Sequence, residues 1–299
     1  MRWRGYAAVT AAAVLWGISG VVAKSLFSGR VDPLALVEIR LTAAFALTLV
    51  IFKVQRRPVR LPRGEVLRLL PLGAAMVLAQ TTYYLTISLA DVATAIFLQY
   101  TAPAFVVAYG IILHRERLTA VQAISLSGVI GGAYLLVAGP GGLAVTPAAL
   151  ATGIASAIGF AAWVLVGRSR ARTTGSWEML LYALGTGAVL WSLFVPPWQA
   201  YLQPYSAAEW GMIAFIVLAA SLVPFGLFLY GLRFIDSRAA SLTATIEPVV
   251  AAGVAAAFIG ETLTGRGIAG AALILASVIL LHVMPGVPTR QTRPAEGDA

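Results

Sequence analysis

The chain has 299 residues, of which 60% are hydrophobic and only 11% are charged, and its formal net charge is +9. A mean hydropathy of +0.87 with so few charges excludes an ordinary soluble domain, in which about 25% of residues are charged. The absence of cysteine excludes disulfides, thiolate metal sites and thiol redox chemistry.

Apolar stretches of about 20 residues recur along the chain, and each is long enough to cross a bilayer as a helix. We therefore predict an all-α polytopic membrane protein with ten transmembrane helices joined by short loops. The predicted ranges are 6–27, 34–53, 65–87, 91–112, 119–138, 147–167, 177–197, 208–231, 237–259 and 265–283. The tail at 285–299 is polar and rich in proline, and we expect it to be disordered.

The first range contains the stretch "WGISGVVAK", in which Gly17-Ile18-Ser19-Gly20 resembles a nucleophilic serine motif. A membrane serine protease needs a histidine at the depth of its serine, and the only histidines are His114 and His282. His114 falls in an inner loop and His282 at the inner end of the last predicted helix, both far from Ser19, so we predict no catalytic residue and no enzyme. We interpret the helix itself as retained, because its apolar run is longer than that of a secretory signal.

The second helix carries Glu38 and Arg40, which are two residues apart and so point to different faces. Lys24 and Glu38 both fall near the outer surface and can pair there, as a gate or as a static clasp. We assign Lys24, Glu38 and Arg40 to gating.

Polar and aromatic residues gather in the third, fourth and sixth helices, at depths where polar side chains are costly. With Trp16 of the first helix they are the predicted substrate-binding residues, although ordinary helix packing is the alternative for each aromatic alone. The set is Gln80, Tyr83, Tyr84, Gln99, Tyr100, Trp163 and Trp16, with Thr81 and Thr82 beside it.

Two prolines, Pro103 and Pro248, each fall about twelve residues into a predicted helix. A proline there frees the carbonyl four residues earlier, that of Gln99 or Ala244, which bilayer depth tolerates only inside protein or beside a wet cavity. We predict a hinge at both prolines, with a plain structural kink as the alternative. Glu247 precedes the second proline and joins the gating set, and an interhelical ion pair is its structural alternative.

The chain also repeats itself: "QYTAPAFVVAYGIILHRERLT" (99–119) aligns with "TIEPVVAAGVAAAFIGETLT" (245–264) when the two prolines are superimposed. In both copies a glutamate follows the proline by thirteen residues, at Glu116 and Glu261. We predict two five-helix repeats, at 1–140 and 141–284, of which the second is inverted because five is an odd number. Inverted repeats are typical of secondary transporters, whose substrates bind between the repeats near the midplane.

Lysines and arginines define the predicted orientation, because cytoplasmic loops carry an excess of them. With both termini cytoplasmic, 17 of the 21 fall on the inner side. These are Arg2, Arg4, Lys53, Arg56, Arg57, Arg60, Arg63, Arg68, Arg115, Arg117, Arg168, Arg170, Arg172, Arg233, Arg238, Arg290 and Arg293.

With these motifs the chain resembles the EamA family of the drug/metabolite transporter superfamily. The residues that carry the resemblance are Trp16-Gly17, Lys24, Arg40 and the runs Tyr84…Pro103…Glu116 and Tyr230…Glu247-Pro248…Glu261. The resemblance implies a multi-pass carrier of the bacterial inner membrane that exports amino acids, related metabolites or drugs by alternating access. The third, fourth, eighth and ninth helices are then expected to line the cavity, with contributions from the first and the sixth. One departure is that Ala102 stands in the first copy where Glu247 stands in the second.

Within that family the chain is most similar to amino-acid exporters, including the aromatic amino-acid type. We therefore expect a secondary transporter that exports small amphipathic metabolites, with neutral hydrophobic or aromatic amino acids favoured. The alternative is a multidrug exporter of cations with Glu247 as counter-charge, and a membrane-embedded enzyme or scaffold is less favoured. The expected partners are a small-molecule substrate and the lipid bilayer. We expect no metal, cofactor, nucleic acid or ATPase subunit, and a monomer or homodimer.

Overall fold

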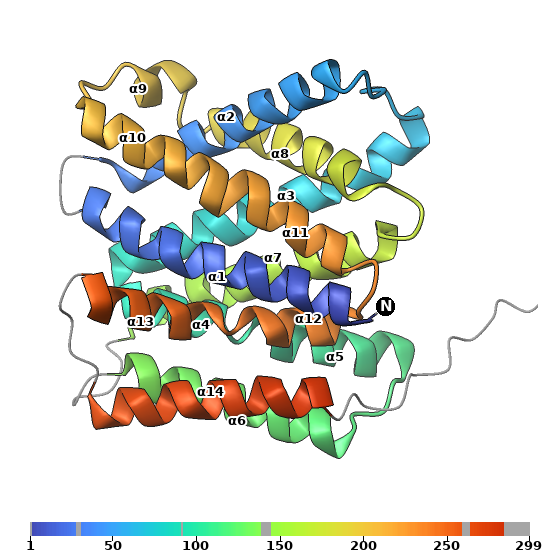
Figure 1. Ribbon diagram of the computed structural model, residues 1–299, viewed down its shortest axis with the longest axis vertical. Coiled ribbons are helices and arrows are strands. Elements are labelled where there is room, and N and C mark those ends of the chain that lie inside the picture. Colours follow the sequence, from blue (N-terminus) through green and yellow to red (C-terminus); the bar gives the residue numbers. More distant parts are fainter. Residues whose placement is uncertain (1, 28–30, 91, 139–144, 259–263, 284–299) are drawn as a thin grey trace, which may run out of the picture.

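The computed structural model describes residues 2–27, 31–90, 92–138, 145–258 and 264–283 as a bundle of helices, and no strand occurs among them (Figure 1). Glu261 and the tail at 285–299 lie outside the described residues, and so does the side chain of Lys24.

Helices occupy all ten predicted ranges. Seven ranges each hold one uninterrupted helix, namely α1 (Arg2–Phe27), α2 (Pro33–Val54), α3 (Arg63–Leu89), α6 (Ala120–Val137), α7 (Pro147–Arg170), α8 (Ser176–Ser192) and α14 (Gly265–Val283). The other three ranges hold interrupted helices, namely α4 (Val92–Gln99) with α5 (Ala102–His114), α10 (Ala207–Ile216) with the π-helix η1 (Val217–Leu222) and α11 (Val223–Gly231), and α12 (Ser237–Ala244) with α13 (Glu247–Phe258). A short helix, α9 (Pro197–Tyr201), lies in the connection between α8 and α10.

Eight helical spans of the described chain are long and apolar enough to cross a membrane. The shorter helices α6 and α8 are not among them, so the count of ten spans stays a prediction. The N-terminus and the connections after α2, α5, α7 and α11 gather at one end of the bundle (Figure 1). This is the arginine-rich end that the sequence assigns to the cytoplasm, and its placement in a cell also stays a prediction.

The helices begin where side chains satisfy the first free backbone N–H groups. Asp32 caps α2, with Pro33 in the first turn, and Thr146 caps α7 in the same way. Thr119 and Gln122 form a reciprocal capping box at the start of α6.

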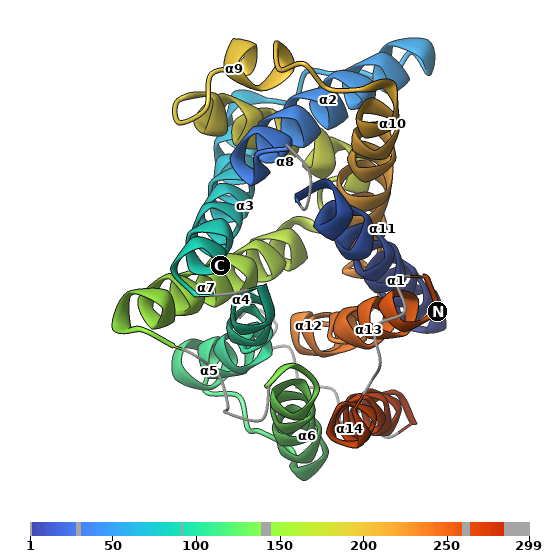
Figure 2. The same ribbon diagram turned by 90° about the vertical axis from the view of Figure 1, so that its left-hand side faces the viewer.

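The first helix of each predicted repeat packs against the other repeat. Helix α1 lies against α11, α12 and α13, while α7 lies against α3, α4 and α5. The second helices, α2 and α8, pack together at one edge of the bundle, and the fifth helices, α6 and α14, pack together at the opposite edge (Figure 2). The two halves are therefore interlocked through their first helices.

Glycines allow two of these contacts to be made through backbone. A Cβ added to Gly132 of α6 would lie 2.7 Å from the Gly270 carbonyl oxygen of α14. A Cβ added to Gly17 of α1 would lie 2.7 Å from the Glu247 carbonyl oxygen, where α13 begins. Gly17 is thus required for the approach of α1 to the first turn of α13.

Candidate functional site

The fourth and ninth predicted helices are broken, which corrects the expectation of two continuous helices with a proline in the middle. The breaks are Tyr100–Thr101, between α4 and α5, and the residues 245–246, between α12 and α13. Pro103 and Pro248 are each the second residue of the helix that follows. A proline is well tolerated there because its missing N–H would have no intrahelical partner in the first turn.

Threonines help to end the helices before both breaks. The Thr101 hydroxyl donates to the Leu98 carbonyl at 2.6 Å, and the Thr245 hydroxyl donates to the Leu242 carbonyl. In the described chain, none of the backbone hydrogen bonds that span the breaks goes to the carbonyl of Gln99 or of Ala244. Both breaks therefore leave backbone acceptors inside the bundle.

A small cavity lies between the two breaks. Its lining comes from α4, α5, α7, α12, α13 and both breaks, and consists of Gln99, Tyr100, Ala102, Pro103, Phe160, Ser241, Ala244, Thr245 and Glu247. Its volume is about 20 Å³, roughly the room that one water molecule needs, whereas ligand pockets hold about 300 Å³ or more. The conformation is thus closed around this point.

Polar side chains of the cavity wall link the two halves of the chain. The Tyr100 hydroxyl donates a hydrogen bond to the Glu247 carboxylate, across the two breaks. The Gln99 Nε2 amide donates to Ser156 Oγ at 2.9 Å, and Ser156 Oγ donates to the Ala79 carbonyl at 2.9 Å. The Gln99 amide is thereby held against α7, with its oxygen uncommitted in these hydrogen bonds.

Arg40 lies in the interior rather than at the surface, with 8% of its area exposed. Its Nε donates to Ser221 Oγ at 2.9 Å and its Nη2 donates to the Ala220 carbonyl at 3.2 Å. Both acceptors belong to η1, and the Ala220 carbonyl also accepts the Trp16 indole N–H at 3.1 Å. The π-helix therefore anchors α1 and α2 together, and π-helical turns are frequent at functional sites. The Arg40 charge also acts on the Glu247 carboxylate.

Glu38 faces a different neighbour. It is fully buried, its Oε1 accepts from Ser192 Oγ of α8 at 2.9 Å, and its Oε2 has no hydrogen-bond partner among the described residues. The predicted pairing with Lys24 concerns a side chain outside the described residues. The gating role of both residues stays a prediction.

The two tryptophans of the predicted site belong to an aromatic cluster. Trp163 is 1% exposed, and its ring lies 5.8 Å from Phe160, 5.2 Å from Phe225 and 5.0 Å from Phe228, between centroids. Trp16 contacts the same three phenylalanines at 6.4, 5.2 and 5.8 Å. Of this cluster only Phe160 reaches the cavity wall.

Of the predicted site residues, the structure brings Gln99, Tyr100, Pro103 and Glu247 together at the cavity. Tyr83 packs edge-on against Tyr84 at 5.5 Å and lies within electrostatic range of Glu247. Gln80 is half-buried on α3 and is not in the wall of the closed cavity.

The sequence reasoning missed Phe160, Phe225, Phe228 and Ser221. A helical-spacing signal was available for the phenylalanines, since Phe160 precedes Trp163 by three residues and Phe225 precedes Phe228 by three. Ser221 gave no such signal, because its importance comes from Arg40, 181 residues earlier.

An ion pair lies at the arginine-rich end of both broken helices. Arg238, at the start of α12, pairs with Glu116, which follows α5, and its Nη1 donates to Gln122 Oε1 of α6 at 3.2 Å. Arg238 is buried, whereas Glu116 is about one-third exposed. The pair ties the two halves together at this end.

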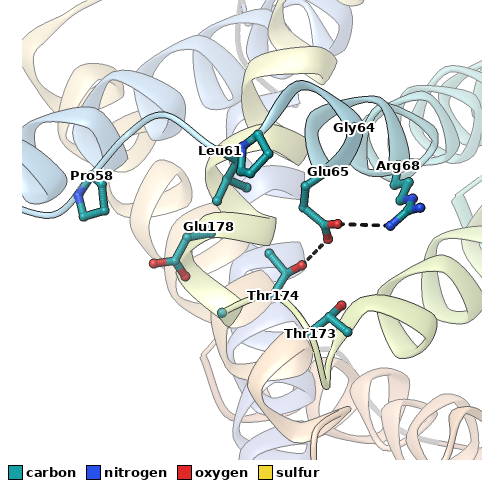
Figure 3. A pocket seen from close by; sticks show the side chains of 10 residues that line it. Pro58, Leu61, Gly64, Glu65, Arg68, Thr173, Thr174 and Glu178 are labelled. Carbon is teal, nitrogen blue, oxygen red and sulfur yellow. Dashed lines mark hydrogen bonds and ion pairs between the residues drawn. The ribbon is translucent and has the colours of Figure 1, made fainter.

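A larger, open depression of about 550 Å³ lies at the same end, between the α2–α3 and α7–α8 connections (Figure 3). Glu65 projects into it, accepting from the Thr174 hydroxyl and lying 3.7 Å from Arg68 Nη1 (Figure 3). None of the predicted site residues lines it.

A bundle of membrane-length helices in which two broken helices meet at an interior polar cavity defines a membrane transporter. The model of the EamA-like transporter family matches residues 3–138 and 147–283, and the chain belongs to this family.

Its relatives agree with this class. The chain is 28% identical over 290 residues to an uncharacterized transporter of Archaeoglobus fulgidus, covering 94% of this chain and 96% of that protein. It is 29% identical over 291 residues to the uncharacterized inner membrane transporter YicL of Salmonella typhimurium, covering 94% and 95%. A solved crystal structure shares the fold with a TM-score of 0.80 at 18% identity, covering 94% of this chain and 96% of that one.

Proposed function

We propose that this transporter exports small amphipathic metabolites across the bacterial inner membrane by alternating access, and that neutral hydrophobic or aromatic amino acids fit it best. The observation that carries the proposal is the meeting of the two broken helices at a cavity that combines Gln99, Tyr100 and Glu247 with the Phe160 ring. Amide, hydroxyl and free carbonyl groups suit the polar end of an amino acid, and aromatic rings suit its side chain.

The closed cavity supports an alternating-access cycle. With room for about one water, it must open toward one side and then the other to pass a solute. The two breaks are the positions at which the backbone can bend without losing regular helical hydrogen bonds.

The test is efflux from proteoliposomes loaded with a labelled mixture of amino acids, with and without a pH gradient. We expect selective loss of aromatic or branched species, and the response to the gradient reports proton coupling. The triple variant Gln80→Ala, Gln99→Ala, Tyr100→Ala should lose this efflux while it still elutes as a folded protein. Undiminished efflux from that variant contradicts the site assignment.

A second candidate is export of cationic drugs, which is favoured by the Glu247 carboxylate in the cavity wall. This candidate predicts efflux of cationic dyes but not of amino acids. It also predicts that the Glu247→Gln variant loses the efflux of these dyes.

A further inference from the structure

Arg40 is a buried cation without a carboxylate partner at ion-pair distance among the described residues. Its two hydrogen bonds, to Ser221 Oγ and the Ala220 carbonyl, go to neutral acceptors. They occupy two of the five N–H groups of a guanidinium, so three remain, enough for bidentate binding of a carboxylate.

Glu247 is the complementary group. Its carboxylate lies in the cavity wall and accepts a hydrogen bond from Tyr100. It is linked to Arg40 through α1, because Arg40 and Trp16 donate to the same Ala220 carbonyl and the next residue, Gly17, packs against the Glu247 backbone. Two opposite charges kept apart inside a membrane protein are expensive, because each loses its hydration and has only neutral hydrogen-bond partners in return. A ligand that carries both charges would satisfy both groups at once.

We propose that Arg40 and Glu247 form a bipolar site that selects zwitterions, in which Arg40 binds the carboxylate of the solute and Glu247 with Tyr100 binds its ammonium group. This inference rests on the proposed function and specifies its substrate class as free α-amino acids rather than cations or carboxylic acids. Arg40 is not part of the lining of the closed cavity, which is too small for the solute. Binding therefore takes place in an opened state in which Arg40 joins the lining.

Three solutes with the same ring test the proposal: phenylalanine, phenethylamine, which lacks the carboxylate, and 3-phenylpropionate, which lacks the ammonium group. Each competes with labelled phenylalanine for counterflow in proteoliposomes at neutral pH. In the unaltered protein we expect both analogues to compete at least about tenfold more weakly than phenylalanine, because a site built for a polar group rejects analogues that lack it.

Two variants then test which residue binds which charged group of the solute. Arg40→Gln should remove the preference for phenylalanine over phenethylamine, and Glu247→Gln should remove the preference over 3-phenylpropionate. Arg117→Gln, which changes an exposed arginine, is the matched control and should keep both preferences. A purely structural role of Arg40 would lower all fluxes and leave the preference unchanged.

If Arg40→Gln fails to fold, two further measurements test the bipolar site. Ser221→Ala loosens the anchor but keeps the guanidinium, so both preferences should persist. The second measurement uses the unaltered protein. If phenethylamine competes there as well as phenylalanine does, the bipolar site is wrong, whereas the proposed export of amino acids is not contradicted. If phenylalanine itself is neither bound nor moved, the proposed function and this inference fall together.

Discussion

The two broken helices share a backbone plan but not a set of side chains. Each is interrupted for two residues, each resumes with a proline in its first turn, and each has a threonine hydroxyl on a leucine carbonyl. The residues around the breaks differ, being Gln99, Tyr100 and Ala102 in the first copy and Ala244, Thr245 and Glu247 in the second.

The comparison shows that both copies of the repeat form the same backbone break, whereas the polar side chains at the cavity differ between the copies. The first copy contributes the Gln99 amide and the Tyr100 hydroxyl, and the second contributes the Glu247 carboxylate. The proposed cationic partner of the solute, Arg40, comes from α2 and is anchored by η1 of the second half.

The largest effect is expected from moving the carboxylate to the other copy. Glu247→Ala should lower amino-acid efflux at least about tenfold, because the solute loses its anionic partner. The double variant Ala102→Glu, Glu247→Ala should not recover it, because Ala102 is buried in the wall of the same small cavity, where the closed state has no room for a glutamate side chain. Recovery of efflux in proteoliposomes would contradict this prediction, because the carboxylate would then work from either half. Glu247→Asp, which keeps a carboxylate in the second copy, is the conservative control.

The next largest effect concerns Gly17, which meets the backbone of the second break. Gly17→Ala places a methyl group 2.7 Å from the Glu247 carbonyl oxygen, so α1 must move away from α13 at a cost of about 3 kcal/mol. Gly20→Ala on the same helix meets nothing within 4 Å and should be neutral or slightly stabilising. Thermal unfolding in detergent measures both, and equal melting temperatures would contradict the close contact.

A moderate effect is expected at the ion pair between Arg238, at the start of the second broken helix, and Glu116, which follows the first. The residue aligned with Arg238 in the first copy is Ala93, so the first broken helix has no arginine at this position. Glu116→Gln should destabilise by about 1–2 kcal/mol, because it removes the negative charge beside a buried cation and leaves that cation only neutral acceptors. Arg238→Gln should cost less, because Glu116 is partly exposed and can be hydrated. The reverse order of melting temperatures would show that the glutamate is the more constrained partner.

The smallest effect is expected from Ser19→Ala. Its hydroxyl donates to the Leu15 carbonyl of its own helix at 2.6 Å and is buried, so it is held by local structure. We expect a change in stability within about 0.5 kcal/mol and unchanged efflux. A large loss of efflux would reopen a functional role for this serine.

Much of the fold follows from sequence patterns that act locally. The apolar ranges predict where helices form, because a bilayer requires long runs of apolar residues with internal hydrogen bonds. Pro103 and Pro248 marked both interruptions, although a proline alone does not distinguish a kinked helix from two shorter ones. In the structure each helix ends before its break, and the Thr101 and Thr245 hydroxyls donate to carbonyls of the last turn.

The sequence by itself thus determined the class of protein, the helical ranges, the repeat and the paired prolines, because each depends on composition or spacing over a few turns of helix. Only the tertiary structure decided which polar groups meet. Arg40 reaches Ser221, Glu38 reaches Ser192 and Tyr100 reaches Glu247, each across more than 140 positions of the chain. These partners are set by how α1 and α7 cross between the halves, and helix periodicity carries no information about that crossing.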